Sequence, residues 1–488
     1  MVVPDEAARV STLSLVRGLT HALEAEPVSY CHWKSNAFLD RSRNGQNDLD
    51  LLIRRSDIDA FSALMHALGF KRATKPSGSL PGIEDYYGHE PSTERLVHVH
   101  AHYQLIVGDD LTKNYRIPLE EAFLDTTIRD GEFRIPIPEL ELILLVIRLT
   151  LKHSTWDAML AKRAKVPASA LEEVAFLRQR ADERELKRLL KEHLPFVEQE
   201  AFDVAMASLH SSTTARVRAG RHLATQLAPC ARRTRAADVS LKFWRRGVAT
   251  VRARLPFDEP RKQLAGGGAI VALIGADGAG KSTCADSLSS WLGKDFEVAK
   301  LHLGRPPRSG LTLVVDPFLK LVLGLAALRR RAGNASAHSS LRSRAYAAYA
   351  VATARDRYLA YRRARRLAGD GALVICDRFP LPHLSLMDAP QVDRLRPDAD
   401  ASRLDRRLAS RERRYYRALT SPDVLVVLRV DPEIAVARKP DELPEFVRGR
   451  WREIWEIDWP AVPAHVVDAG RSMPEVLSEV KALIWSQL

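Results

Sequence analysis

Residues 275–283 constrain this 488-residue chain more than any other segment. They read Gly-Ala-Asp-Gly-Ala-Gly-Lys-Ser-Thr and fit the pattern G-x-x-x-x-G-K-[ST] without a substitution. The apolar run 269–274 before them has strand character, and the residues from Ser282 to Trp291 are compatible with a helix. A strand, a glycine-rich turn and a helix in this order predict a loop that binds the phosphates of a nucleoside triphosphate.

The chemistry of a phosphate-binding loop explains the spacing. Glycines let the backbone direct its N–H groups inward onto phosphate oxygens. Lys281 adds a positive charge for the β- and γ-phosphates, Ser282 offers a hydroxyl ligand to Mg²⁺, and the helix N-terminus faces the same anion. The predicted nucleotide-binding residues are Gly275, Asp277, Gly278, Ala279, Gly280, Lys281, Ser282 and Thr283.

Length and charge limit the class of protein. A chain of this length suggests roughly two to four domains. Its 74 basic and 61 acidic residues give a net charge of +13, which favours anionic partners such as nucleotides, nucleic acid or an acidic membrane surface.

The expected location is the cytoplasm. The four cysteines are scattered without a C-x-x-C pair, which argues against a zinc site or a disulfide framework. Asp5 and Glu6 stand where a signal peptide would need positive charge. The most apolar stretch, 311–328, contains Asp316, Pro317 and Lys320 and is a poor membrane span.

Changes in sequence texture predict three parts. Residues 1–138 have the pattern of a small α/β domain, with strands expected at 28–34, 48–53 and 95–105 and a helix at 58–68. Residues 139–262 are expected to form a helical connector, with the stretch 255–268 as the best linker candidate. Residues 263–488 are expected to form the third part, with a helical insertion at 311–368.

The third part alternates between strand and helix patterns, which predicts a parallel sheet with helices on both faces. Its strand candidates are 269–274, 297–303, 372–376, 424–430 and 464–468. The candidate at 372–376 leads directly into Asp377 and Arg378. A carboxylate at such a strand end holds Mg²⁺ or its water shell, and Arg378 could reach an acceptor phosphate.

Residues 275–283 and Asp377-Arg378-Phe379 resemble the thymidylate kinase family of nucleoside monophosphate kinases. The strand 424–433 followed by Ala437-Arg438-Lys439 is similar to that family's approach to its lid, and 466–469 resembles its last strand and adenine-side loop. The resemblance covers roughly residues 265–488. It implies a five-stranded parallel sheet and Mg²⁺-dependent transfer of a phosphoryl group from ATP to an acceptor phosphate.

The resemblance also assigns expected roles. Asp277 matches the loop acid that contacts the acceptor sugar, Arg378 the arginine of the DR motif, and Arg305 the acceptor-phosphate arginine. Arg438, with Arg448, Arg450 and Arg452 nearby, falls where a lid supplies charge to the transferred group. The expected catalytic residues are Lys281, Asp377, Arg378 and Arg438, the acceptor-binding residues Asp277, Arg305 and Arg378, and the Mg²⁺ ligands Ser282 and Asp377.

The acceptor stays open at this stage. The segment 304–310 reads Gly-Arg-Pro-Pro-Arg-Ser-Gly, without the glutamate of the family's Arg-Glu-Pro-Gly loop. Pro380-Leu381-Pro382-His383 follows the DR motif without the family's later base-reading run. The acceptor could therefore be dTMP, another nucleotide or a small phosphorylated metabolite.

The insertion 311–368 is rich in arginine and tyrosine. One interpretation is a surface for nucleic acid or anionic lipid, with Tyr346, Tyr349, Tyr358 and Tyr361 as stacking groups. The favoured one is a helical lid subdomain whose tyrosines pack internally and whose arginines are solvated or face the acceptor. The oligomeric state is open, with a dimer among the options.

The N-terminal part resembles the nucleotidyltransferase superfamily over roughly residues 25–135. The resemblance rests on Trp33-Lys34-Ser35-Asn36 and on the segment 45–53, which contains Asp48-Leu49-Asp50. Strand alternation places Asp48 and Asp50 on one face, as a Mg²⁺ site of that family requires. The third carboxylate is expected on a later strand, where His100-Ala101-His102 stands instead.

His98, His100 and His102 are expected on one strand face, which makes a metal cluster conceivable. Alternate residues of a strand stand roughly 7 Å apart, so one ion is not expected to take all three.

The sequence thus predicts an ATP-dependent phosphotransferase joined to a nucleotidyltransferase-like domain. Two alternatives remain: a nucleotide-gated binding module, and a protein whose main chemistry lies at Asp48 and Asp50.

Overall fold

The computed structural model describes residues 12–76, 80–154, 165–254, 261–330, 336–382, 384, 388–395, 402–438 and 444–488. The chain forms two compact units, unit 1 at Met1–Pro260 and unit 2 at Arg261–Leu488. Each unit has hydrophobic core clusters of its own. Among the described residues, no helix combines the length and the apolar character needed to cross a membrane.

Unit 1 is built on strands in the order β1-β2-β5-β4-β3. Their bounds are β1 Tyr30–His32, β2 Leu49–Ile53, β3 Lys71–Thr74, β4 Ile83–Glu90 and β5 Arg95–His102. β2 and β5 run parallel, whereas the other neighbours are antiparallel. The register places Asp50 opposite His100, and His100 opposite Asp85. Three chemically active side chains of separate strands therefore lie in one row.

One face of this sheet is apolar. Val97, Val99 and Ala101 of β5 are buried in a core shared with α1 (Ser14–Ala25) and α3 (Ile58–Ala67). Because side chains alternate along a strand, His98, His100 and His102 occupy the opposite face, as expected.

Five further helices follow in unit 1. They are α5 (Pro138–His153), α7 (Ala168–Arg180), α8 (Glu183–His193), α9 (Gln199–Ser208) and α10 (Thr213–Gln226). α5 contacts each of the other four and is buried along nearly its whole length. Its core includes Trp33 and Leu52 of the strand region, so strands and helices share one interior. The division into a domain 1–138 and a connector 139–262 stays a prediction.

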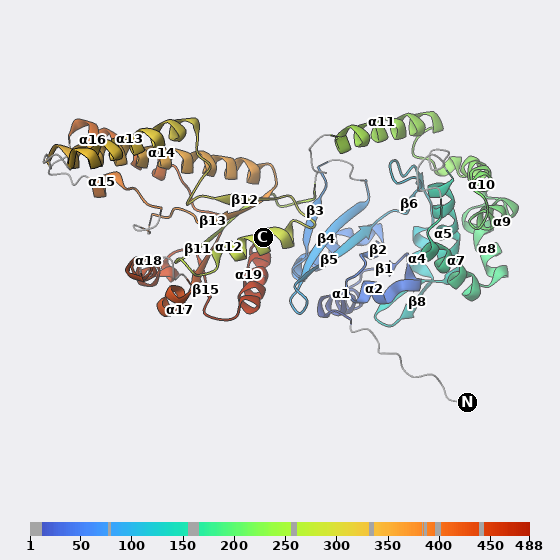
Figure 1. Ribbon diagram of the computed structural model, residues 1–488. Coiled ribbons are helices and arrows are strands. Elements are labelled where there is room, and N and C mark those ends of the chain that lie inside the picture. Colours follow the sequence, from blue (N-terminus) through green and yellow to red (C-terminus); the bar gives the residue numbers. More distant parts are fainter. Residues whose placement is uncertain are drawn as a thin grey trace. The chain divides into compact units, whose positions relative to one another are not determined.

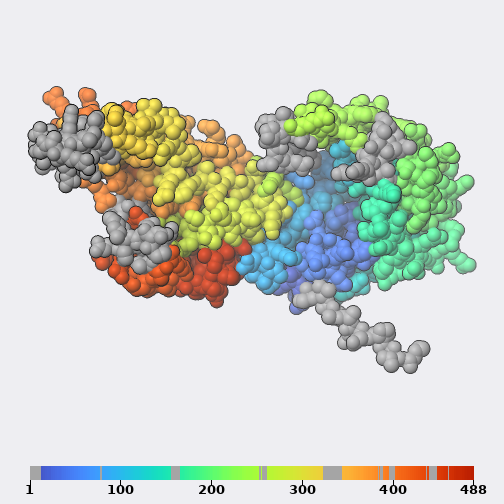
Figure 2. All heavy atoms as spheres, viewed as in Figure 1, coloured from blue at the N-terminus to red at the C-terminus, as the bar shows by residue number. Residues whose placement is uncertain are grey.

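The remaining elements of unit 1 are short, apart from one helix. They are η1 (a 3₁₀ helix, Asn36–Phe38), α2 (Leu39–Arg43), η2 (Arg55–Asp57), β6 (Ile106–Val107), β7 (Tyr115–Arg116), α4 (Glu120–Asp125), β8 (Thr127–Asp130), β9 (Phe133–Pro136) and η4 (Ala228–Cys230). The longer helix α11 (Arg235–Arg254) lies on the surface of unit 1, where Trp244 is 71% exposed (Figure 2, light green).

Unit 2 contains the expected parallel sheet. Its five strands have the order β12-β13-β11-β14-β15, and every neighbouring pair is parallel. The bounds are β11 Ala269–Gly275, β12 Val298–His302, β13 Leu373–Asp377, β14 Val424–Arg429 and β15 His465–Asp468, and a short strand β10 (Gln263–Leu264) precedes them. All five predicted strands are confirmed to within two residues, as is the five-stranded parallel sheet.

Helices cover both faces of this sheet (Figure 1). α12 (Lys281–Leu292) and α19 (Met473–Gln487) pack against one face, and α14 (Ser336–Gly369) against the other. Coverage on both sides explains why β13 is buried at every position and reads as a continuous apolar run.

The insertion 311–368 is helical wherever it is described. α13 (Gly310–Arg330) and α14 pack together, and α16 (Arg403–Arg417) packs against α14. Tyr361 is buried in the core, and Arg365 hydrogen-bonds to Thr420 and Ser421 O. Thus at least part of the insertion's tyrosine and arginine content serves internal packing. Arg331 lies outside the described residues.

Four further elements complete unit 2. They are α15 (Val392–Leu395), α17 (Pro432–Ala437), α18 (Pro444–Glu456) and η6 (Trp459–Ala461).

Candidate functional site

The glycine-rich loop connects β11 to α12 and requires its glycines. Gly275, Gly278 and Gly280 have φ values of 155°, 84° and 87°, which side-chain-bearing residues rarely adopt. A Cβ atom on Gly275 would lie 2.5 Å from Leu428 O, and one on Gly278 2.8 Å from Ala435 O. The loop is therefore held against the carboxyl end of β14 and the helix after it.

Lys281 starts α12 and points back into the loop. Its side chain is 6% exposed, and Nζ donates a 2.7 Å hydrogen bond to Ala276 O. Burial, together with the nearby charge of Arg378, lowers the pKa of Lys281 to about 8. The ammonium group is thus charged near neutral pH but easily deprotonated above it.

Ser282 and Asp377 join the loop to the end of β13. Ser282 Oγ donates a 2.6 Å hydrogen bond to Asp377 Oδ2. Asp377 is 2% exposed, and its other oxygen, Oδ1, is buried without a hydrogen-bond partner among the described residues. An orphaned carboxylate oxygen beside a hydroxyl is the oxygen-rich donor set that Mg²⁺ prefers, so the residues fit this ion.

Asp277 is the centre of a charge cluster in the loop. Arg378 donates to Asp277 Oδ1 at 2.5 Å, Arg450 of α18 donates to Oδ2, and Lys281 Nζ lies 4.0 Å from Oδ1. Burial of Asp277 opposes its ionisation, but these three cations outweigh burial and hold the pKa of the carboxyl below its usual value. The carboxylate therefore gathers three positive groups at one end of the loop.

Arg378 has a backbone conformation that is uncommon for a side-chain-bearing residue, with φ at 63°. Its N–H donates to Leu273 O at 3.1 Å, which anchors it to β11. With the backbone held there, the guanidinium of Arg378 points toward the glycine-rich loop, where it donates to Asp277.

The remaining predicted site residues are Arg438, Thr283 and Arg305. Arg438 contacts the backbone of the loop. Its guanidinium donates to Gly278 O at 3.4 Å and to Ala469 O at 3.2 Å. Thr283 and Arg305 are exposed. Arg305 is fixed through its backbone, whose N–H donates to His302 Nδ1 at 2.9 Å.

Several polar residues beside Arg378 were not expected from the sequence. Arg357 of α14 donates to Leu303 O at 3.2 Å, to Gly304 O at 3.1 Å and to Asp388 Oδ1 at 2.6 Å. A Cβ atom on Gly304 would lie 2.6 Å from Arg378 Cδ and 3.0 Å from both Asp388 Oδ2 and His302 Cε1. Gly304 therefore permits the close approach of three polar side chains next to the loop.

A cavity of about 680 Å³ opens at the carboxyl ends of β14 and β15. It is lined by Arg429, Asp431, Ile434, Trp455, Val466, Asp468, Gly470 and Arg471. Arg429 stacks on Trp455 with 3.5 Å between the guanidinium carbon and the ring centroid. The cavity thus combines an aromatic wall with hydrogen-bonding groups.

Unit 1 brings a second polar cluster together on its sheet. His98 links two carboxylates, with Nδ1 2.9 Å from Asp48 Oδ1 and Nε2 2.7 Å from Asp85 Oδ1. Asp50 Oδ1 lies 2.7 Å from Lys34 Nζ and 3.2 Å from His100 Nδ1. Asp48 and Asp50 as Mg²⁺ ligands stay a prediction, as does the nucleotidyltransferase-like character of this unit.

Asp85 and Lys34 were missed as members of this cluster. A third carboxylate was expected near His100, and Asp85 of β4 faces that histidine across the strand pair. Its signal in the sequence was weak, because the polar run 83–90 lacks the apolar alternation that marks a strand.

Comparison with known proteins gives a partial picture. No family model matches the chain. An uncharacterized ATP-binding protein, YghR, of Escherichia coli K12 is 28% identical over 223 residues, which covers 44% of this chain and 86% of the relative. The same protein from another Escherichia coli strain, O6:H1 CFT073, matches equally.

Solved structures with similar parts include two of deoxyadenosine kinase from M. mycoides and one of thymidylate kinase from Candida albicans. The deoxyadenosine kinase structures, one with dCMP and dCDP and one with dATP, match with TM-scores of 0.29 and 0.27 at 19% and 18% identity. Both comparisons cover 44% of this chain and 98% of that kinase. The thymidylate kinase matches with a TM-score of 0.30 at 20% identity, over 45% of this chain and 91% of that chain.

Proposed function

We propose that unit 2 is an ATP-dependent phosphotransferase that moves the γ-phosphate of ATP to the phosphate of a small acceptor. The observation that carries the proposal is the convergence of Lys281, the Ser282–Asp377 pair and the Arg378–Asp277–Arg450 cluster on one glycine-rich loop. Such a site suits a reaction that needs positioning and charge neutralisation more than covalent help.

The donor is held by the loop. Its backbone N–H groups and the N-terminus of α12 receive the β- and γ-phosphates, and Lys281 adds its charge once ATP replaces Ala276 O as its partner. The cavity beside Trp455 offers an aromatic wall for the adenine ring. Support for ATP as the nucleotide comes from the relative in Escherichia coli, which is described as ATP-binding.

Ser282 and Asp377 would hold Mg²⁺, Asp377 through the oxygen that lacks a partner. When bound, Mg²⁺ neutralises charge on the β- and γ-phosphates.

The acceptor phosphate is received by the arginines around Asp277. Arg378 and Arg450 each donate to that carboxylate and can turn a second N–H toward a phosphate oxygen. Asp277 thereby orients both cations, and its second expected role is a hydrogen bond to a hydroxyl group of the acceptor. Arg305, exposed just beyond the carboxyl end of β12, adds positive charge on the acceptor side. Arg438 stabilises the loop through its hydrogen bond to Gly278 O. It approaches the transferred phosphoryl group if the segment that carries it closes over the site.

The test is a screen for acceptor-dependent ADP release. Purified full-length protein with Mg-ATP is offered dTMP, other nucleoside monophosphates and sugar phosphates in separate reactions. We expect one class of acceptor to raise ADP release well above the rate with ATP alone, and Lys281→Ala to abolish the increase without unfolding the protein. Full turnover in Lys281→Ala, or no response to any acceptor, would contradict the proposal. ATP binding without turnover would favour the nucleotide-gated module.

A further inference from the structure

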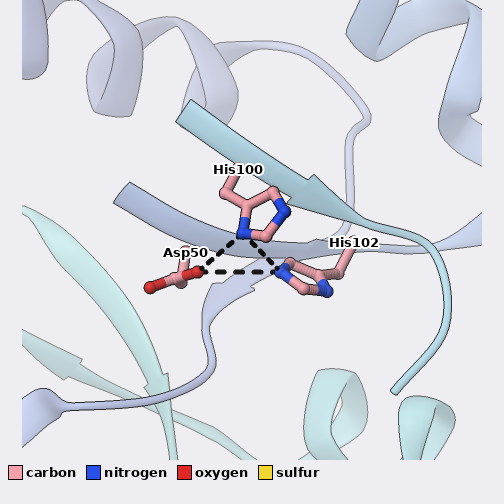
Figure 3. A group of neighbouring side chains, drawn as sticks. All are labelled: Asp50, His100 and His102. Atoms are coloured by element: carbon pink, nitrogen blue, oxygen red, sulfur yellow. Dashed lines mark hydrogen bonds and ion pairs between the residues drawn. The ribbon is translucent and has the colours of Figure 1, made fainter. Parts of the chain in front are cut away.

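Three side chains on the polar face of the unit 1 sheet meet at a single point (Figure 3). Asp50 comes from β2, and His100 and His102 come from β5. His100 Nδ1 lies 3.2 Å from Asp50 Oδ1 and 3.2 Å from His102 Nε2, and the third edge, from His102 Nε2 to Asp50 Oδ1, is 3.6 Å. One oxygen and two ring nitrogens thus form a nearly regular triangle.

The size of this triangle is that of a metal coordination shell. A tetrahedral ion with ligand bonds of about 2.0–2.1 Å holds its ligand atoms about 3.3 Å apart. The rotation of the rings brings the two nitrogens closer than the spacing of alternate residues along a strand would suggest. One ion need not take three histidines here, because the third ligand is the carboxylate of Asp50 on the neighbouring strand.

We propose that Asp50, His100 and His102 bind one divalent transition-metal ion of the Zn²⁺ class. Two imidazoles and one carboxylate suit such ions, whereas Mg²⁺ prefers oxygen ligands alone. The site is therefore chemically different from a Mg²⁺ site on Asp48 and Asp50, and it does not depend on the function proposed for unit 2.

The surroundings of the triangle are consistent with this role. His102 is 2% exposed, and its Nε2 faces both His100 Nδ1 and Asp50 Oδ1, so this ring nitrogen is held in place for an ion. Asp48 and Asp85 stay paired with His98, and their negative charge lies close to the bound ion without occupying its ligand positions. The ligand set is thus Asp50, His100 and His102 alone.

Two cavities leave the ion accessible. One of about 790 Å³ is lined by His100 and by Asp85 and Lys113, and one of about 330 Å³ is lined by Asp50 and by Asp48. Three protein ligands with an open position are the arrangement of catalytic rather than structural zinc sites. Water or a substrate group could therefore complete the coordination.

Lys34 competes with the ion in the described conformation. Its Nζ lies 2.7 Å from the same Asp50 oxygen that completes the triangle. The ammonium must move away from the carboxylate when the ion binds, which its 24% exposed side chain permits. Replacing Lys34 by an uncharged residue of similar length should therefore tighten metal binding.

The experiment measures Zn²⁺ and Mg²⁺ binding to full-length, tag-free, nucleotide-free protein by equilibrium dialysis and elemental analysis. We expect one Zn²⁺ per chain, bound far more tightly than Mg²⁺. Asp50→Asn and His100→Asn should each weaken Zn²⁺ binding on the order of 100-fold. The matched control is His98→Asn on the same strand face, which should leave the affinity nearly unchanged.

Lys34→Met provides a variant whose effect cannot come from misfolding. It should tighten Zn²⁺ binding about tenfold or more, because a positive charge next to the ion is removed. The proposal is overturned if Asp50→Asn and His100→Asn bind Zn²⁺ like the unaltered protein, if His98→Asn loses as much affinity as they do, if Mg²⁺ binds as tightly as Zn²⁺, or if Lys34→Met does not gain affinity.

Discussion

Ser282 Oγ donates a hydrogen bond of 2.6 Å to Asp377 Oδ2, although the two residues are 95 positions apart. The bond joins the first turn of α12 to the end of β13 and leaves Asp377 Oδ1 without a partner among the described residues. We therefore expect Asp377→Asn to lower phosphotransfer on the order of 100-fold or more, since the amide carries no charge for Mg²⁺. Turnover as a function of Mg²⁺ concentration checks this.

ATP binding measured in EDTA serves as the control for Asp377→Asn, because the loop itself is unchanged. The nucleotide should still bind there with an affinity close to that of the unaltered protein. An unchanged Mg²⁺ dependence of turnover would argue against Asp377 as a ligand.

The buried position of Lys281 predicts a pH dependence of ATP binding. Burial and the charge of Arg378 lower the pKa of its ammonium group to about 8, with Asp277, Asp377 and Asp388 acting in the opposite direction. The protonated form binds phosphate, so ATP affinity should be highest below pH 8. It should fall as pH rises through that value, by up to about tenfold per pH unit.

The comparison variant is Lys281→Arg, since a guanidinium stays protonated throughout this range. Its ATP affinity, whatever its value at pH 7, should change little between pH 7 and 9.5. Titration with a fluorescent ATP analogue measures both slopes, and equal slopes would show that Lys281 is not the titrating group.

The donor side of the candidate site could be read from the sequence because it is local. The loop and its strand are one continuous segment, and the central strand β13 is an uninterrupted apolar run that ends on Asp377. A parallel sheet that helices cover on both faces produces such apolar runs. The alternation of strands and helices could therefore be predicted from the sequence alone.

Part of the side that we propose for the acceptor could not be predicted in this way. Gly304, Arg357 and Asp388 come from three separate segments and meet only after α14 has packed against the sheet. No spacing rule connects them. In unit 1, Asp85 could not be predicted for the same reason. It joins the row of histidines through the antiparallel register of β4 and β5 and not through a sequence motif.

Two arginines on α18, in the region where a lid is expected, contact different partners and can be compared as variants. Arg450 donates to Asp277 in the loop, whereas Arg448 pairs with Glu433 on α17. We expect Arg450→Ala to lower acceptor-dependent turnover on the order of 10³-fold. Arg448→Ala should change it little, because an exposed ion pair contributes on the order of 1 kcal/mol or less.

Steady-state kinetics with the acceptor found in the screen separate the two arginines. Losses of equal size in both variants would assign the effect to the general charge of α18 rather than to the contact with Asp277.

Gly304 tests whether the close approach of Arg378, Asp388 and His302 matters for the acceptor. A methyl group at this position would lie 2.6 Å from Arg378 Cδ, so the arginine must move. Gly304→Ala should therefore raise the acceptor KM or lower kcat by about tenfold or more while ATP affinity stays unchanged, since small displacements of positioning groups are costly. Gly310→Ala is the control, because a Cβ atom there meets nothing within 4 Å. Unaltered acceptor kinetics in Gly304→Ala, at an unfolding temperature equal to that of Gly310→Ala, would remove this cluster from the acceptor site.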